Sequence, residues 1–168
     1  MRPAALFLLP VILFSAGCGR EEFPPNSRKV AEWVIVRGGA VAIAGKKEQL
    51  RDASLLPDKP FGIAAINFIN AELTQKDFKR LSEINQLDRL SLYGTKISDE
   101  GLDSLLGINS LNELELSNTE ITDTGLKKLA NIKTLKKLYL HNTLVTKKGV
   151  HAFQKSLPGC KVFADPIN

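Results

Sequence analysis

The amino-acid sequence predicts an α/β fold in which short parallel strands and helices alternate along a right-handed solenoid. Three observations predict it. Apolar residues recur with a fixed spacing of 24 residues through most of the chain. In each copy they first alternate with single polar residues, as in a half-buried strand. A pair of apolar residues three apart then follows, as on one face of a helix. Because one such unit cannot bury its own apolar face, successive units must stack.

Three clear copies of the pattern follow one another without insertion. The first reads Leu87-x-x-Leu90-x-Leu92-x-x-Thr95-x-Ile97 and continues to Gly101-Leu102-x-x-Leu105. The second begins at Leu111 and the third at Leu135, and a degenerate copy begins at Ile63. Val162 falls 24 residues after Leu138, so a further strand is expected over residues 160–163.

Polar residues at fixed positions of the repeat have predicted structural roles. Inward-pointing hydroxyls that satisfy turn backbone groups are expected at Thr95, Thr119 and Thr143. The helix N-cap position falls on Ser98, Thr122 and Thr146. Asp99 and Asp123 follow in the first helical turn, where the helix dipole favours a carboxylate.

This pattern resembles the leucine-rich repeat, in the variant with Thr where many members carry Asn or Cys. It is most similar to bacterial leucine-rich-repeat lipoproteins whose units read T-x-I-[ST]-x-x-G-L, in the ribonuclease-inhibitor-like or cysteine-containing class. The resemblance covers residues 61–164. It implies a parallel sheet on the concave side and helices on the convex side.

Residues 28–60 are predicted to cap the first repeat. A helix over residues 28–37 is indicated by three apolar residues at helical spacing, Val30, Trp33 and Val34. Gly38-Gly39 ends that helix. Val41 and Ile43 alternate as a short edge strand, and residues 46–60 read as a polar loop.

The last strand is expected to cap the other end of the stack. Pro158-Gly159 ends the final helix before it, and residues 165–168 form a tail. With a cap at each end, residues 28–164 are expected to form a complete small domain.

The first 17 residues are predicted to be a signal peptide of the lipoprotein type. The apolar run over residues 4–14 is too short to span a bilayer, which needs about 20 apolar residues. Small residues then precede Cys18. The segment resembles a bacterial lipobox, with Ser15 in place of the usual Leu, and the resemblance implies cleavage before Cys18 and a diacylglycerol on its sulfur. An ordinary signal peptide in which Cys18 is incidental is the alternative.

Residues 18–27 read as a polar tether between the lipid and the folded domain. The expected location is therefore the bacterial cell envelope, with the protein held on a membrane by the lipid on Cys18. The sequence does not distinguish the inner membrane from the outer one.

Nothing in the sequence predicts catalysis, a cofactor or a metal site. His141 and His151 have no Cys or carboxylate pair at metal-ligand spacing. Cys160 is expected to be unpaired and buried in the last strand. The net charge of +5 is spread along the chain, which favours a solvated surface over a nucleic-acid footprint.

The exposed strand positions form the predicted binding face. By repeat position they are Arg89, Glu113 and Lys137, then Ser91, Glu115 and Tyr139, then Tyr93, Ser117 and His141, with Asn67 and Ile69 from the first unit. Five short strands offer about 400 Å², whereas a stable interface uses about 800 Å² per partner. Tight binding therefore needs a small partner, neighbouring loops, the 46–60 loop, or several copies acting together.

The leading hypothesis is a monomeric, non-catalytic, lipid-anchored module that binds a protein or another envelope polymer. One alternative is a secreted or periplasmic stoichiometric inhibitor or saccharide-binding protein. Another is an enzyme with a site in the 46–60 loop. A fourth, an intracellular ubiquitin-pathway adaptor, is disfavoured by the N-terminal signal.

Replacing Cys18 with Ser should release the protein from membranes, because a thioether-linked lipid cannot form on a hydroxyl side chain. Fractionation of cells that express the native chain or C18S, followed by a high-salt wash, measures this. A variant that stays with the washed membranes would rule out the lipid anchor.

Overall fold

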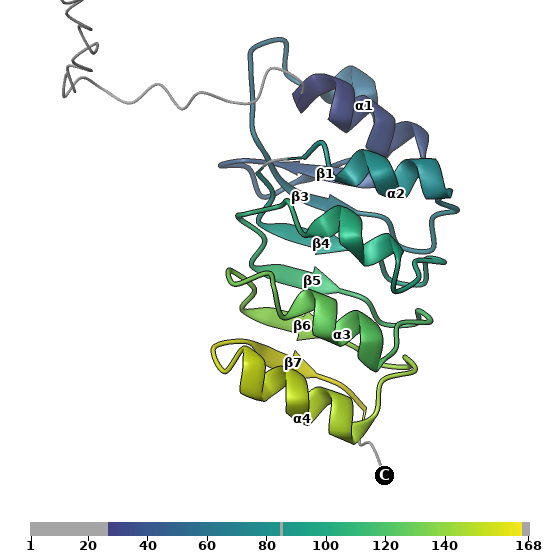
Figure 1. Ribbon diagram of the computed structural model, residues 1–168. Coiled ribbons are helices and arrows are strands. Elements are labelled where there is room, and N and C mark those ends of the chain that lie inside the picture. Colours follow the sequence, from purple (N-terminus) through teal and green to yellow (C-terminus); the bar gives the residue numbers. More distant parts are fainter. Residues whose placement is uncertain (1–26, 85, 166–168) are drawn as a thin grey trace, which may run out of the picture.

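The computed structural model of the chain describes residues 27–84 and 86–165. Cys18, the signal segment and most of the tether lie outside these residues. Within them, one seven-stranded sheet carries helices along one face (Figure 1). The elements in chain order are α1 (Ser27–Val36), β1 (Ala40–Ile43), β2 (Gln49–Leu50), the 3₁₀ helix η1 (Ala53–Leu55), β3 (Ile63–Asn67), α2 (Gln75–Leu81), β4 (Arg89–Ser91), the 3₁₀ helix η2 (Gly101–Leu105), β5 (Glu113–Glu115), α3 (Asp123–Leu129), β6 (Lys137–Tyr139), α4 (Lys147–Ser156) and β7 (Lys161–Phe163).

The sheet has the order β2-β1-β3-β4-β5-β6-β7, and its strands from β3 to β7 are parallel. The residues that pair between neighbouring parallel strands are 24 positions apart, so Leu90 faces Leu114, Leu114 faces Leu138, and Leu138 faces Val162. The predicted α/β class, the period and the strand over residues 160–163 are confirmed.

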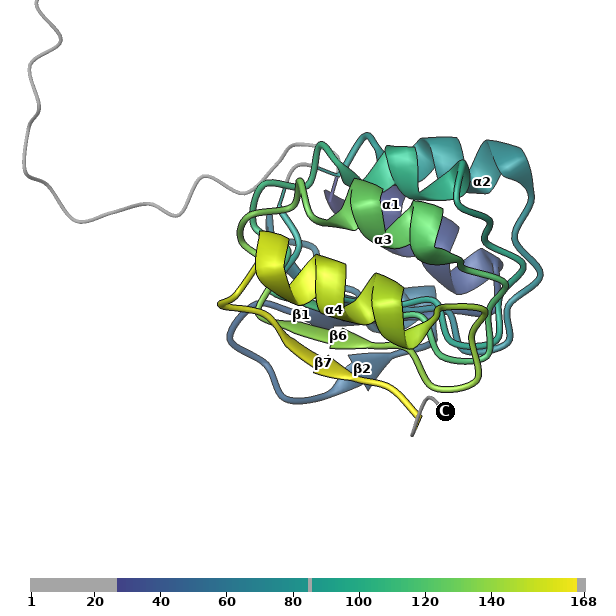
Figure 2. The same ribbon diagram turned by 60° about the horizontal axis from the view of Figure 1, so that its bottom comes forward.

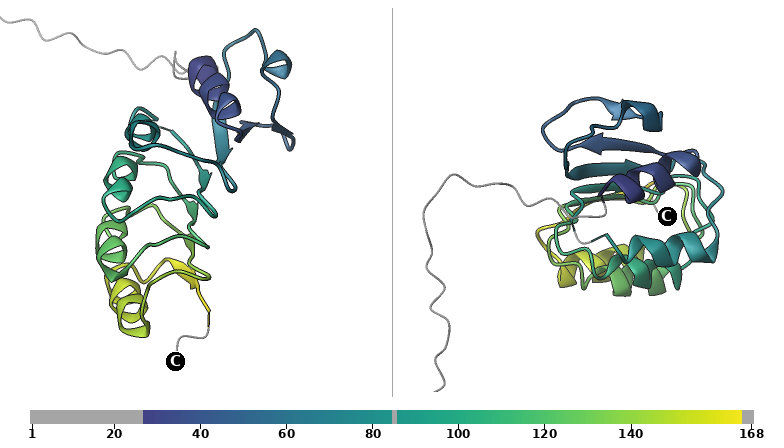
Figure 3. Two further views of the ribbon diagram at one scale, coloured as in Figure 1. Left: turned by 90° about the vertical axis from the view of Figure 1, so that its right-hand side faces the viewer. Right: turned by 90° about the horizontal axis from the view of Figure 1, so that it is seen from above.

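The helices and the sheet form two layers, which Figure 2 shows in oblique view and Figure 3 in profile. The helical segments α2, η2, α3 and α4 lie side by side on one face of the sheet. Between the layers, the repeated leucines and isoleucines are almost fully buried in one continuous core. The opposite face of the sheet carries no helix. Among the described residues, no helix combines the length and the apolar character needed to cross a bilayer.

The inward threonines behave as the repeat pattern predicts. The hydroxyls of Thr95, Thr119 and Thr143 each donate to the carbonyl oxygen three residues earlier, at 2.8, 2.5 and 2.8 Å. Each bond satisfies a carbonyl at the turn that follows a strand. The threonines therefore close the turns from inside the core.

Thr122 and Thr146 are the N-caps of α3 and α4, as predicted. The aspartates, however, act mainly one repeat away from their own helix. The Asp99 carboxylate accepts from the backbone N–H and the hydroxyl of Thr122, at 3.0 and 2.5 Å. Asp123 accepts from Thr146 in the same way, at 2.8 and 2.7 Å. Each aspartate thus fixes the helix start of the next repeat.

A glycine makes room for each crossing carboxylate. A Cβ on Gly125 would collide with Asp99, and a Cβ on Gly149 would collide with Asp123. These two repeats therefore need Gly three residues after the capping Thr, because any side chain there would displace the carboxylate.

The second repeat departs from the prediction, because Ser98 is not a helix N-cap. Its hydroxyl donates to Glu100 at 2.7 Å, and the 3₁₀ helix η2 begins later, at Gly101, without a side-chain cap. Gln75 stands where a crossing aspartate would come from. No carboxylate therefore reaches Ser98 from the preceding repeat, and the position lacks the bonds that Thr122 and Thr146 receive.

In the segment before the repeats, the structure contradicts one prediction, the edge position of the first strand. Helix α1 and the glycines that end it agree with the prediction, and Trp33 and Val34 are buried. Strand β1 is not an edge strand. It lies between β2 and β3, antiparallel to both, and all four of its residues are buried. The edge is β2, which forms within the segment read as a polar loop because a turn at Gly45 folds the chain back onto β1.

A buried carboxylate joins α1 to the first repeat. Asp77 accepts from the Trp33 indole N–H at 3.1 Å, pairs with Arg37 at 2.9 Å, and accepts from the backbone N–H and the hydroxyl of Thr74 at 2.9 and 2.6 Å. Arg80 lies over the Trp33 ring at 5.3 Å. Burial alone would raise the pKa of Asp77, but the hydrogen bonds from Thr74 and Trp33 and the charge of Arg37 together hold that pKa below its ordinary value.

Asp77→Asn should lower the free energy of unfolding by about 2 kcal/mol at neutral pH, because the buried bonds to an ionised acceptor are lost. Since the folded pKa is depressed, this stabilisation is present above the ordinary carboxyl pKa of about 3.9 and is lost as the pH falls through the folded pKa. Urea unfolding of both proteins across this range measures it.

The matched control is Asp58→Asn, whose side chain is fully exposed and pairs with Arg28 at 3.5 Å. It should change stability by less than about 0.5 kcal/mol. A D77N protein as stable as D58N at neutral pH would contradict the role given to Asp77.

Candidate functional site

One face of the sheet carries no helix, and we call it the open sheet face (Figure 3). The strand pairing arranges its side chains in three rows. The strand registers align Arg89, Glu113 and Lys137 in one row, and Asn67, Ser91, Glu115 and Tyr139 in a second. The third row holds Ile69, Tyr93, Ser117 and His141, just beyond the strands. The structure therefore brings the predicted positions together on one surface.

These predicted residues differ in exposure. Arg89, Lys137, His141 and Ile69 are exposed, whereas Tyr93 and Tyr139 are half-buried rather than fully exposed. Ser117 was expected on the surface, but it is buried. Its hydroxyl accepts from the His141 N–H at 3.0 Å, and its own N–H donates to Glu115 at 2.7 Å. Ser117 is thus part of the turn scaffold, and the prediction that it is exposed on the binding face is wrong.

The face also extends further than the predicted set. Lys161, Phe163 and Asp165 continue the three rows on β7 and beyond it, each 24 residues after a predicted member. Continuing the period by one unit would have found them. Gln49 of β2 also borders the face, and the repeat gives no signal for it.

An aromatic pair lies at the β7 end of the open sheet face. The rings of Tyr139 and Phe163 stack with centroids 4.7 Å apart and planes 12° apart, and Phe163 remains 38% exposed. Burial, followed by the charge of Glu113, raises the pKa of Tyr139, so the phenol stays protonated. The two rings therefore form a flat apolar surface that carries the Tyr139 hydroxyl.

A shallow polar hollow of about 200 Å³ lies beside this pair, over β3, β4 and β5. Its lining includes Asn67, Arg89, Ser91, Glu113 and Glu115, with Gln49 from β2. Glu113 forms an ion pair with Lys137 at 3.4 Å. The open sheet face therefore changes from charged groups over the first repeats to aromatic groups at its end.

The turns after the strands share one backbone geometry. Asn70, Gly94, Asn118 and Asn142 have φ between 51° and 66°, in the left-handed region that Gly and Asn tolerate best. The N–H groups of the first three donate to carbonyl oxygens of the following repeat, on Tyr93, Ser117 and His141. These bonds extend the ladder past the strands.

The last turn has no following repeat, and a side chain takes its place. Asp165 accepts from the Asn142 N–H at 2.6 Å and lies 2.9 Å from His141 Nδ1. The backbone N–H of Asn142, and then His141, hold the pKa of Asp165 below its ordinary value. The carboxylate therefore does for Asn142 what a carbonyl does in the earlier turns.

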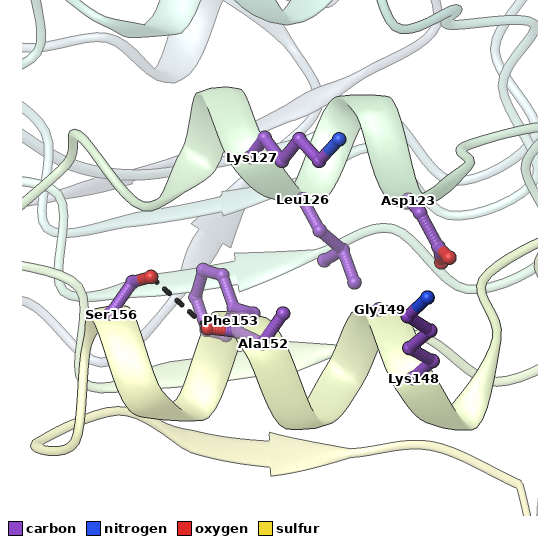
Figure 4. Close-up of a pocket in the computed structure, with 8 residues that line it drawn as sticks. All are labelled: Asp123, Leu126, Lys127, Lys148, Gly149, Ala152, Phe153 and Ser156. Atoms are coloured by element: carbon purple, nitrogen blue, oxygen red, sulfur yellow. Dashed lines mark hydrogen bonds between the residues drawn. The ribbon is translucent and has the colours of Figure 1, made fainter.

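A second hollow lies on the helical side, between α3 and α4 (Figure 4). It has a volume of about 270 Å³ and an apolar floor that includes Leu126 and Phe153. Its one carboxylate, Asp123, lies beside Gly149 and is engaged by Thr146. The hollow is thus a gap between neighbouring repeats whose polar group already has partners.

The side chains capable of chemistry are dispersed. Among the described residues, no three His, Cys, Asp or Glu side chains gather where they could hold a metal ion. Cys160 is free and buried, just before β7, and burial raises the pKa of its thiol to about 11. The thiol is therefore protonated at neutral pH.

The pairing of residues 24 apart, strand after strand, with a helix returning each time on the same face, defines the architecture. The fold is of the leucine-rich-repeat type. No protein-family model matches the chain, and no curated protein matches it.

Solved structures do resemble it. Actin-binding site 2 of leiomodin-1 is 20% identical, with 60% of this chain and 69% of that chain covered and a TM-score of 0.50. A leucine-rich-repeat protein of Leptospira interrogans is 23% identical over 54% of this chain and 22% of its own, with a TM-score of 0.41. Internalin C2 of Listeria monocytogenes is 15% identical over 82% of this chain and 81% of its own, with a TM-score of 0.35.

Asp165→Ala should speed the exchange of the Asn142 amide hydrogen about tenfold or more, because that N–H loses its acceptor. The Gly94 amide, which donates to Ser117 within the stack, should exchange at its native rate. Amide exchange followed by NMR measures both. If the two amides behave alike in native protein and variant, Asp165 does not hold the last turn.

Proposed function

We propose that the chain is a non-catalytic leucine-rich-repeat lipoprotein of the bacterial cell envelope that binds a protein partner on its open sheet face. The proposal includes the finer description of the fold, a right-handed solenoid with a cap at each end. It is supported by α1, which Asp77 fastens to the first repeat, and by Asp165, which completes the last turn.

The observation that carries the proposal is the stacked pair Tyr139 and Phe163. Aromatic side chains supply much of the contact energy at protein interfaces, and tyrosine is enriched among the residues that dominate it. Here the two rings lie in parallel on an uncovered sheet, flanked by Lys137, Lys161 and His141. The arrangement offers an apolar centre with a polar rim.

A binding role also agrees with how the carboxylates are used. Asp77, Asp99, Asp123 and Asp165 each accept structural hydrogen bonds. Glu113 is paired with Lys137. Acid–base chemistry needs carboxyl groups that are available to a substrate, whereas these groups hold the scaffold.

The small size of the face agrees with an anchored protein. A face of about 400 Å² suits weak contacts, and confinement to a membrane raises the effective concentration of several copies. The lipid on Cys18 would supply that confinement.

A saccharide is the second candidate ligand, because the near-parallel rings of Tyr139 and Phe163 form a flat surface. The apolar face of a sugar ring fits such a surface, and the nearby carboxylate of Asp165 could accept from sugar hydroxyls. The alternative of a secreted or periplasmic inhibitor uses the same face, with an enzyme as the partner.

Replacing both Tyr139 and Phe163 with Ala should weaken partner binding by about 2 kcal/mol or more, roughly thirtyfold. Partners are first captured by crosslinking from native envelopes with the lipidated chain. Affinities for the captured protein, and for envelope glycans, are then measured with purified native and variant chains of equal thermal stability.

Tyr93→Ala is the matched control, because Tyr93 lies on the same face but outside the stacked pair. It should leave the affinity within about threefold of native, as most interface positions do. Equal weakening by Y93A would move the site toward β4, and native affinity in the double variant would remove the aromatic pair from it. Binding of glycans alone would favour the second candidate.

A further inference from the structure

Charge is unevenly distributed between the two ends of the stack. Residues 124–165 contain nine lysines and a single acidic residue, Asp165. Residues 27–123 contain fifteen acidic residues and twelve lysines or arginines. The last two repeats are therefore strongly cationic, while the rest of the described chain is slightly anionic.

Four of these lysines lie at one edge of the molecule. Helices α3 and α4 run opposite to the strands, so the last helical turns and the first strand residues meet at the same edge (Figure 1). Lys155 lies in the last turn of α4, Lys133 and Lys136 lie between α3 and β6, and Lys161 begins β7. We call this set the lysine edge. Lys127 does not belong to it, because its side chain extends toward Asp123 at the start of α3 (Figure 4).

The ammonium groups of the lysine edge are exposed and make no ion pair with any described residue. By contrast, Lys128 and Lys137 of the same region are paired with Asp103 at 2.9 Å and Glu113 at 3.4 Å. The carboxylates of the preceding repeat are therefore occupied. The lysine edge has no internal counter-charge.

The repeat provides a comparison within the same chain. One unit earlier, the positions of Lys133 and Lys136 are held by Asn109 and Asn112. The scaffold thus accepts neutral residues at these positions. The charge is not needed to build the repeat.

We propose that the lysine edge binds the anionic headgroups of a phospholipid membrane. The partner class follows from the side chains. All four cations are exposed lysines, with no arginine fork and no apolar centre among them. Such a set suits a diffuse layer of phosphate charge, because the contributions of the separate lysines to the binding free energy add together.

An acidic protein would instead be expected to meet an aromatic or arginine anchor at the centre of its site. The open sheet face has such a centre in Tyr139 and Phe163, and the lysine edge has none.

The start of the folded chain lies on the same side as the lysine edge. The Arg37–Asp77 pair places the end of α1 at the beginning of α2, so α1 runs opposite to α2 and begins toward the lysine edge (Figure 1). Cys18 precedes Ser27 by nine residues, a reach of about 30 Å at most. On the proposed lipid anchor, this tether would allow the edge to touch the membrane that holds the lipid.

The test uses residues 18–168 carrying Cys18→Ser, since the described core lies wholly within residues 27–165. Sedimentation with phosphatidylcholine vesicles is compared with and without phosphatidylglycerol. Binding should need phosphatidylglycerol and should fall at least about tenfold as salt rises from about 0.1 M to about 0.5 M. Changing Lys133, Lys136, Lys155 and Lys161 to Glu should weaken it about tenfold or more.

The matched control changes Lys76, Lys96, Lys147 and Lys148 to Glu, which alters the net charge equally on exposed residues at the opposite edge, where the strands end and the helices begin. It should weaken binding much less. No binding to phosphatidylglycerol, equal loss in both variants, or tighter binding to soluble polyglutamate than to vesicles would overturn the proposal. Because this chain carries no lipid, such a failure leaves the proposed anchor and the partner site on the open sheet face unaffected.

Discussion

The structure depends on one constraint, which is that each repeat leaves backbone groups that only the next repeat can satisfy. Parallel strands three residues long make few bonds, so the ladder is continued past them by turn residues such as Asn118 and before them by Asn112. Side chains follow the same rule when Asp99 and Asp123 bond to residues 23 positions later. Misplacing one repeat would break all of these bonds at once, so the stack admits a single register.

The two ends of the stack are where this rule fails, and each is closed differently. At the first repeat, Asp77 occupies the position that Gly takes in later repeats, because no carboxylate crosses from above. Its side chain is then available to hold Trp33 and Arg37 of α1. At the last repeat, Asp165 replaces the missing carbonyl. The surface between the ends is left to vary, and the aromatic pair and the lysine edge both lie in the last two repeats.

The strands, the core and most of the open sheet face could be predicted because Leu, Thr and Gly recur at one spacing. The same spacing would have led to Lys161, Phe163 and Asp165. The crossing of Asp99 to Thr122 could not be predicted, since it depends on how closely neighbouring helices approach. The burial of Ser117 depends on the same junctions. Strand β2 was missed because two residues without a periodic pattern carry no signal.

Both closing carboxylates lie at the ends of the stack, and every junction from β3 to β7 pairs strand residues 24 positions apart. Adding or removing one complete unit of 24 residues would therefore leave the strand ladder of each junction unchanged. Gene duplication within such a chain can lengthen the protein without redesigning either terminus. The number of repeats is then a heritable variable, and the area offered to a partner can grow in fixed steps during evolution.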